Sequence, residues 1–209
     1  KAYKANQLEE AGEWFTQAIA ADSNYAEAHY MLGKLAADQN DVEAAIESYG
    51  TAFALNPTYI EAGFNLALNL AKNGQEENAL TIYEKLEALG TIHPEAMNNL
   101  GALRIKLGDD DGARRAFSKA LIADPTYSAP AYNLGLDAYR NKQFKEAKQW
   151  FSQAITNEPN YAEAHYMLGK IASDTTDLEG AIAEYQKAFD LKPDYSAAGY
   201  NLALAFDRI

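Results

Sequence analysis

Small and apolar residues recur along the chain with a fixed period of 34 residues. If residue 26 is taken as position 1 of a unit, further units start at residues 60, 94, 128, 162 and 196, without insertion or deletion. Position 7 is leucine in every unit, and position 8 is glycine or alanine. Alanine at position 20 and an aromatic ring at position 24 lie on one face of a helix. The pattern therefore predicts two closely packed helices in each unit.

Proline recurs at position 32, where it would end the second helix just before the next unit begins. The residues concerned are Pro57, Pro125, Pro159 and Pro193. Together these positions resemble the tetratricopeptide repeat, and the resemblance covers essentially the whole chain. It implies an all-α fold, a right-handed superhelical solenoid of stacked antiparallel helix pairs, with each first helix on the concave face. Two departures, Thr91 in place of proline and Gly63 in place of a bulky residue, predict altered pitch or looser packing near residues 60–93.

The repeats predict one solenoid domain with a partial unit at each end. Residues 1–25 would supply the end of a first helix and a second helix, and residues 196–209 a first helix only. The complete repeats are 26–59, 60–93, 94–127, 128–161 and 162–195. Because repeat arrays normally carry capping ends with a polar outer face, we expect a fragment of a longer array. Its uncapped ends would leave Leu202 and Phe206 partly uncovered and allow self-association.

One segment of eleven residues, NYAEAHYMLGK, occurs twice, at residues 24–34 and 160–170. The two copies are 136 positions apart, which is four units, and the similarity continues to Leu68 and Leu204. A block of four units has therefore been duplicated. We expect the concave surface to repeat the same composite site with that rhythm, which would favour multivalent binding in a longer array.

Helical geometry turns positions 2, 5, 6, 9, 12 and 13 toward the concave side if position 8 packs inside. Position 6 is mostly asparagine, with methionine at 31 and 167. The asparagines are Asn65, Asn99, Asn133 and Asn201. Each amide could bond both the N–H and the C=O of an extended peptide backbone, and the column resembles the asparagine ladder of O-linked N-acetylglucosamine transferases. The alternative is that asparagine is simply common at this position of the family.

Two further columns would flank this ladder. Position 5 is mostly aromatic, and exposed rings give contact area at low entropic cost. Its residues are Tyr30, Phe64, Asn98, Tyr132, Tyr166 and Tyr200. Position 13 is mostly basic, including Lys72, Lys106 and Arg140. These cations would favour acidic side chains or a C-terminal carboxylate, although cations at helix C-termini also complement the helix dipole. A carboxylate clamp of the kind that binds heat-shock protein tails is not supported, because position 2 is mostly glutamate and position 5 lacks lysine.

Composition and motifs narrow the classes of function. The net charge of −12 would repel nucleic acid, and the absence of cysteine excludes disulfides and thiolate metal sites. No long apolar run predicts direct membrane insertion, and the compartment stays open between cytoplasm and periplasm. No HExxH, phosphate-loop or nucleophile-elbow motif occurs, and packing explains the three histidines. The acidic run at 108–113 fits a helix-capping turn better than a calcium loop.

We therefore expect no enzyme and no cofactor, but a protein–protein interaction module that binds an extended peptide segment in its concave groove. Two alternatives stay open. One is an assembly scaffold that self-associates through the solenoid ends or the convex face. The other is the substrate-recruiting array of a larger enzyme such as a glycosyltransferase.

Overall fold

The computed structural model describes residues 2–90 and 93–209, and within these ranges the side chains from residue 7 onward. Thr91, one of the two departures from the repeat pattern, lies outside the described residues. The described residues form twelve α-helices and no strand. The helices are α1 (Ala2–Ala21), α2 (Ala26–Asp38), α3 (Val42–Leu55), α4 (Ile60–Lys72), α5 (Glu76–Ala88), α6 (Pro94–Lys106), α7 (Asp110–Ala123), α8 (Ser128–Arg140), α9 (Phe144–Asn157), α10 (Ala162–Asp174), α11 (Leu178–Leu191) and α12 (Ser196–Asp207).

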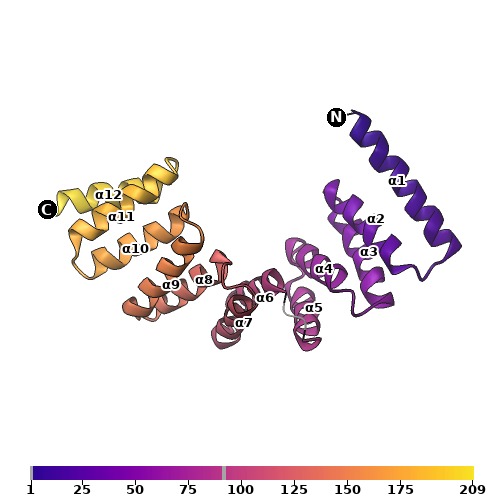
Figure 1. The fold of residues 1–209 in the computed structure, drawn as a ribbon, viewed down its shortest axis with the longest axis horizontal. Helices are drawn as coiled ribbons and strands as arrows, with labels where there is room; N and C mark the ends of the chain where they lie inside the picture. The colour runs from indigo at the N-terminus through magenta and orange to yellow at the C-terminus, as the bar shows by residue number, and fades with distance from the viewer. Residues whose placement is uncertain (1, 91–92) are drawn as a thin grey trace. The chain divides into compact units, whose positions relative to one another are not determined.

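The chain forms two compact units, Lys1–Leu103 and Arg104–Ile209. In the first unit, α2 packs against α3, α3 against α4, and α4 against α5. In the second unit, α8 packs against α9, and α10 against both α9 and α11. Within each unit the helices follow one another as paired hairpins (Figure 1). The predicted all-α solenoid of paired helices is confirmed, while its organisation as one domain of five complete repeats stays a prediction.

The turn between the two helices of a pair is built in the same way along the chain. Position 15 adopts a left-handed backbone conformation, with φ between 59° and 84° at residues 40, 74, 108, 142 and 176. The next residue is the N-cap of the second helix. Where it is aspartate, its carboxylate accepts a hydrogen bond from a backbone N–H, as Asp109 does from Gly112 at 2.8 Å. This contact confirms the capping role predicted for the acidic run.

Close approach of paired helices depends on the small residue at position 8. A Cβ atom added to Gly169 would lie 2.6 Å from Cδ1 of Tyr185, and one added to Gly135 would lie 2.7 Å from Cε1 of Phe151. Both rings belong to position 24, which the sequence pattern placed in the helix interface. The glycines therefore provide the space that the rings of the second helices fill.

Gly63 does not create looser packing, so that part of the expectation is wrong, while an altered pitch near residues 60–93 stays a prediction. A Cβ atom at this position would lie 2.7 Å from Cε2 of Phe53 and 2.8 Å from Cδ2 of Leu86. The Phe53 ring comes from the preceding repeat and fills the space that a bulky residue at position 4 would take. Gly199 and Phe189 repeat the arrangement in the second unit, with an added Cβ 3.1 Å from the ring.

The last helix also differs in part from expectation. Leu202 was expected to be partly uncovered, but it is buried in a cluster with Ala181, Tyr185 and Ala205. Phe206 is 58% exposed, as expected.

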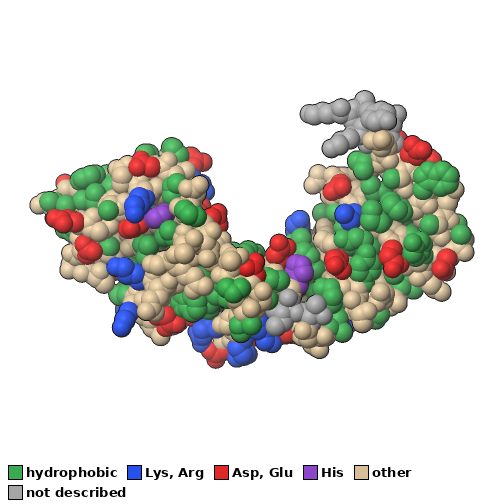
Figure 2. Space-filling model, viewed as in Figure 1, with side chains coloured by type: hydrophobic (Ala, Val, Ile, Leu, Met, Phe, Trp, Pro, Cys, Tyr) green, Lys and Arg blue, Asp and Glu red, His purple; other side chains and the backbone are tan. Residues whose placement is uncertain are grey.

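Over the visible face of each unit, hydrophobic, acidic and basic side chains are interspersed (Figure 2). Among the described residues, no helix combines the length and the apolar character needed to span a membrane.

Candidate functional site

Aromatic rings cluster along the first helices of the pairs. In the first unit, the Tyr30 ring on α2 lies 4.9 Å from the Tyr59 ring and 5.6 Å from the Tyr49 ring, between centroids. The ring at position 5 therefore packs between the ring at position 24 of the same repeat and the ring at position 34, which precedes the next first helix. Phe64 makes the equivalent contact with His93 at 4.8 Å.

The second unit contains two more of these clusters, here called aromatic triads. Tyr132 lies 4.9 Å from Tyr161 and 5.5 Å from Phe151. The other triad is Tyr166, Tyr185 and Tyr195, with centroid distances of 5.6 and 5.0 Å. Position 34 was not among the predicted site residues. The signal was present in the sequence, because this position is tyrosine in five of the 34-residue repeats, counting the partial first one, and histidine in the sixth.

Burial extends to higher pH the range over which the tyrosine hydroxyls of the triads stay protonated. It raises the pKa of Tyr161 and of Tyr195 to about 12, with smaller contributions from neighbouring carboxylates such as Glu163. The pKa of Tyr132 is raised for the same main reason. At neutral pH the triads therefore present neutral rings and hydroxyl groups, which suit apolar contact and hydrogen bonding.

The asparagines of position 6 are partly engaged within the chain. Nδ2 of Asn65 donates to the Glu61 backbone oxygen at 2.9 Å and to the Tyr30 hydroxyl at 3.4 Å. Nδ2 of Asn201 makes the same two contacts, to the Ala197 backbone oxygen at 2.8 Å and the Tyr166 hydroxyl at 3.2 Å. An amide group has two N–H donors, so both are used. Oδ1 of each side chain is the atom left without a partner among the described residues.

The other predicted site residues occupy varied environments. Asn99 and Asn133 are half-buried, while Asn98 is buried. Tyr200 is 66% exposed on α12. Lys72, Lys106 and Arg140 are exposed in the last turns of α4, α6 and α8. At these positions they complement the negative ends of the helix dipoles, as the alternative interpretation proposed.

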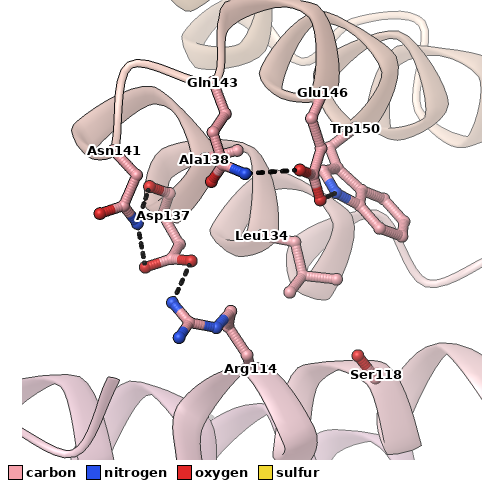
Figure 3. Close-up of a pocket in the computed structure, with 9 residues that line it drawn as sticks. All are labelled: Arg114, Ser118, Leu134, Asp137, Ala138, Asn141, Gln143, Glu146 and Trp150. Carbon is pink, nitrogen blue, oxygen red and sulfur yellow. Dashed lines mark hydrogen bonds and ion pairs between the residues drawn. The ribbon is translucent and has the colours of Figure 1, made fainter. Parts of the chain in front are cut away.

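A second candidate site is a polar depression of 590 Å³ between α7, α8 and α9 (Figure 3). Its floor carries the carboxylate of Asp137, which is only 6% exposed and lies 2.9 Å from Nη1 of Arg114. Asn141 also donates to Asp137, and Glu146 accepts from Trp150 Nε1 at 3.3 Å. These polar groups satisfy one another, through one ion pair between repeats and hydrogen bonds within the repeat, so the arrangement is structural. No group of three or more potential metal-ligating side chains occurs in the part of the chain that the structure describes.

Comparison with family models gives matches along most of the chain. Models described as tetratricopeptide or TPR repeats match residues 33–74, 61–88, 94–127 and 132–196. No curated protein matches the sequence.

Several solved structures have a similar fold. YrrB, a TPR protein with an unusual peptide-binding site, has 22% sequence identity and a TM-score of 0.75, covering 90% of this chain and 97% of that chain. PilF of Pseudomonas aeruginosa has 19% identity and a TM-score of 0.80, with 96% and 91% covered. PilW, a type IV pilus biogenesis factor, has 17% identity and a TM-score of 0.74, with 96% and 93% covered. At these identities the likeness concerns the fold.

Proposed function

The chain belongs to the tetratricopeptide repeat family, and from that premise we propose that it binds an extended polypeptide segment across its first helices. In the first unit the binding surface would comprise α2 and α4, and in the second unit α8, α10 and α12. The aromatic triads would contact side chains of the ligand. Oδ1 of the asparagines at position 6 would accept hydrogen bonds from its backbone N–H groups.

The observation that carries this proposal is the repetition of half-buried rings along the first helices, with the amides of Asn65 and Asn201 each bonded to one of these tyrosines and Oδ1 left to accept. In the second unit, the Tyr132 and Tyr166 rings stand one repeat apart, each with its position-34 tyrosine. Rings already held by their neighbours lose little conformational freedom when a ligand covers them. The surface is thus prepared for contact with side chains that recur along an extended chain.

Geometry indicates how much of a ligand each unit could hold. Packed neighbouring helices are about 8–10 Å apart, so the two steps from Asn133 to Asn201 span roughly 16–20 Å. An extended chain advances about 3.3 Å per residue, which gives about five or six ligand residues. Backbone hydrogen bonds contribute about 0.5–1.5 kcal/mol each, so contacts with the rings must supply much of the affinity.

Family membership and fold support an interaction role. YrrB is a TPR protein with a peptide-binding site, and it matches 90% of this chain in fold. The hydroxyl groups of Tyr30 and Tyr166 accept hydrogen bonds from the amides of Asn65 and Asn201 and so fix the orientation of these amides. Oδ1 of each asparagine is therefore held in place. An oriented acceptor binds a backbone N–H at a lower entropic cost than a mobile one.

A selection from a random peptide library displayed on phage, with the whole 209-residue chain as bait, tests the proposal. Binding constants of the selected peptides are then measured by fluorescence anisotropy for the wild type and two variants. Tyr200→Ala removes an exposed ring from α12, so its effect on folding should be small. Asn133→Ala removes one asparagine of the column. We expect each variant to weaken the binding of peptides to the second unit by about 5- to 30-fold.

The matched control is Ser118→Ala, which changes the α7 wall of the polar depression and lies outside the aromatic triads and the asparagine column. It should leave the binding constants unchanged, and circular dichroism should show equal helicity for all variants. Two results would refute the proposal. One is that selection enriches no peptide. The other is that binding of the enriched peptides responds only to Ser118→Ala, which would move the binding site to the polar depression between α7, α8 and α9.

A further inference from the structure

The two copies of the duplicated segment differ around one tyrosine of the aromatic triads. In the second unit, Nζ of Lys192 lies 2.9 Å from Oε1 of Glu163 and 5.6 Å from the centroid of the Tyr195 ring. The ammonium group is therefore held between a carboxylate and an aromatic face. Both contacts favour a cation, the first by charge-assisted hydrogen bonding and the second by attraction to the ring quadrupole.

The first unit has the carboxylate and the ring but not the lysine. Glu27 and Tyr59 stand at the positions of Glu163 and Tyr195, while Asn56 replaces Lys192. Oδ1 of Asn56 accepts hydrogen bonds from the backbone N–H and hydroxyl of Thr58, at 3.1 and 2.8 Å. The Asn56 side chain is thus turned into its own loop. Among the described residues, no cation pairs with Glu27, which is exposed.

The first unit also carries one more negative charge at this place. Glu61 is exposed where the second unit has Ala197. The pKa of Tyr59 is raised, first by burial and then by the charges of Tyr30, Glu61 and Glu27. Both carboxylates therefore lie close enough to act on the ring. Nζ of Lys34 approaches Tyr30, at 5.9 Å from its centroid, but the Tyr59 ring has no cation over it among the described residues.

We propose that Glu27, Glu61 and the Tyr59 ring bind a lysine or arginine side chain of the partner polypeptide, in the place that Lys192 fills in the second unit. This inference rests on the proposed function, because the place adjoins Tyr30 and its bonded Asn65 on the same peptide-binding surface. The partner of the first unit is therefore a segment with a basic residue. The second unit, which supplies its own lysine, does not select for one.

The experiment uses the same phage selection, with the whole chain as bait, and compares wild type with Asn56→Lys. This variant introduces the lysine of the second unit at a site with nearly the same backbone, since φ and ψ are −132° and 89° at Asn56 and −142° and 86° at Lys192. We expect the wild type to enrich peptides with lysine or arginine at one fixed position. Asn56→Lys should lose that preference while other features of the selected peptides remain.

A peptide from the wild-type selection is then synthesised with norleucine in place of its basic residue. The substitution should weaken binding to the wild type about 5- to 20-fold, and binding to Asn56→Lys less than about twofold. Glu27→Gln combined with Glu61→Gln should reduce the norleucine effect in the same way. The control Gln17→Lys adds the same charge to an exposed position of α1 and should change neither result.

The outcomes separate this inference from the function on which it rests. One outcome is that peptides are enriched and that Tyr200→Ala or Asn133→Ala weakens their binding, but the peptides show no preference for lysine or arginine. The inference is then refuted and the peptide-binding function stands. An equal norleucine effect in the wild type and Asn56→Lys also refutes it, because the basic residue then binds elsewhere. If no peptide is enriched, the proposed function fails and the inference fails with it.

Discussion

At the scale of single residues, the turn inside each helix pair places one residue in the left-handed region. Glycine occupies this position at residues 74 and 108 and asparagine at residue 40, but Thr176 adopts φ of 63° there. A β-branched side chain is strained in this region, whereas glycine is not. We expect Thr176→Gly to raise the free energy of unfolding by about 0.5–1.5 kcal/mol, net of the greater freedom of glycine in the unfolded chain. Urea denaturation measures the change.

Asn40→Gly provides the comparison at the equivalent turn, where φ is 59°. Asparagine tolerates the left-handed conformation better than threonine does, so this change should stabilise the chain by less than Thr176→Gly. If Thr176→Gly lowers stability, the backbone strain assigned to Thr176 is not significant.

At the scale of elements, the contact between α7 and α8 includes a charged pair where the preceding repeat interface has two leucines. Arg114 and Asp137 occupy positions 21 and 10, and the equivalents in the preceding repeat interface are Leu80 and Leu103. Asp137 is 6% exposed, and Arg114 has 41% of its side chain exposed. Arg114→Leu would leave a buried carboxylate with Asn141 as its remaining partner. We expect a loss of about 1–3 kcal/mol, moderated by the solvent around Arg114.

The double variant Arg114→Leu with Asp137→Leu should recover stability to within about 1 kcal/mol of the wild type, because apolar packing can replace a buried pair without a desolvation penalty. A double-mutant cycle from urea denaturation of the four proteins gives the coupling directly. Additive losses in the double variant would show that the pair does not act as a unit.

The limits of sequence reasoning are also clearest at this scale. Helix pairs and the contact between positions 8 and 24 follow from spacing, because they lie within one repeat. Contacts between repeats were harder to predict. To predict that Phe53 fills the space beside Gly63, one must compare position 4 of a repeat with position 28 of the preceding repeat. The burial of Asp137 and the use of both Asn65 amide hydrogens depend on which neighbouring side chain each one meets, and spacing alone does not determine that.

At the scale of the whole molecule, the many tyrosines link stability to alkaline pH. Burial is the main cause that raises the pKa of Tyr49 and of Tyr185 from 10.0 to about 12, and both side chains are almost fully buried. In the unfolded chain tyrosine ionises near pH 10. Between about pH 10 and 12 the folded state therefore keeps protons that the unfolded state has lost. Their contribution to stability is complete below about pH 10 and falls as pH rises toward 12.

We expect the free energy of unfolding to be nearly constant from about pH 8 to 9.5 and then to decrease. Since one pKa unit corresponds to about 1.4 kcal/mol, each of these two rings would contribute a loss on the order of 2 kcal/mol by about pH 12. Urea denaturation at a series of pH values tests this, with phenolate absorbance reporting ionisation. Tyr185→Phe is the control, because position 24 is phenylalanine at residues 117 and 151, and it should reduce the slope. A native phenolate titration centred near pH 10 for all rings would contradict the argument.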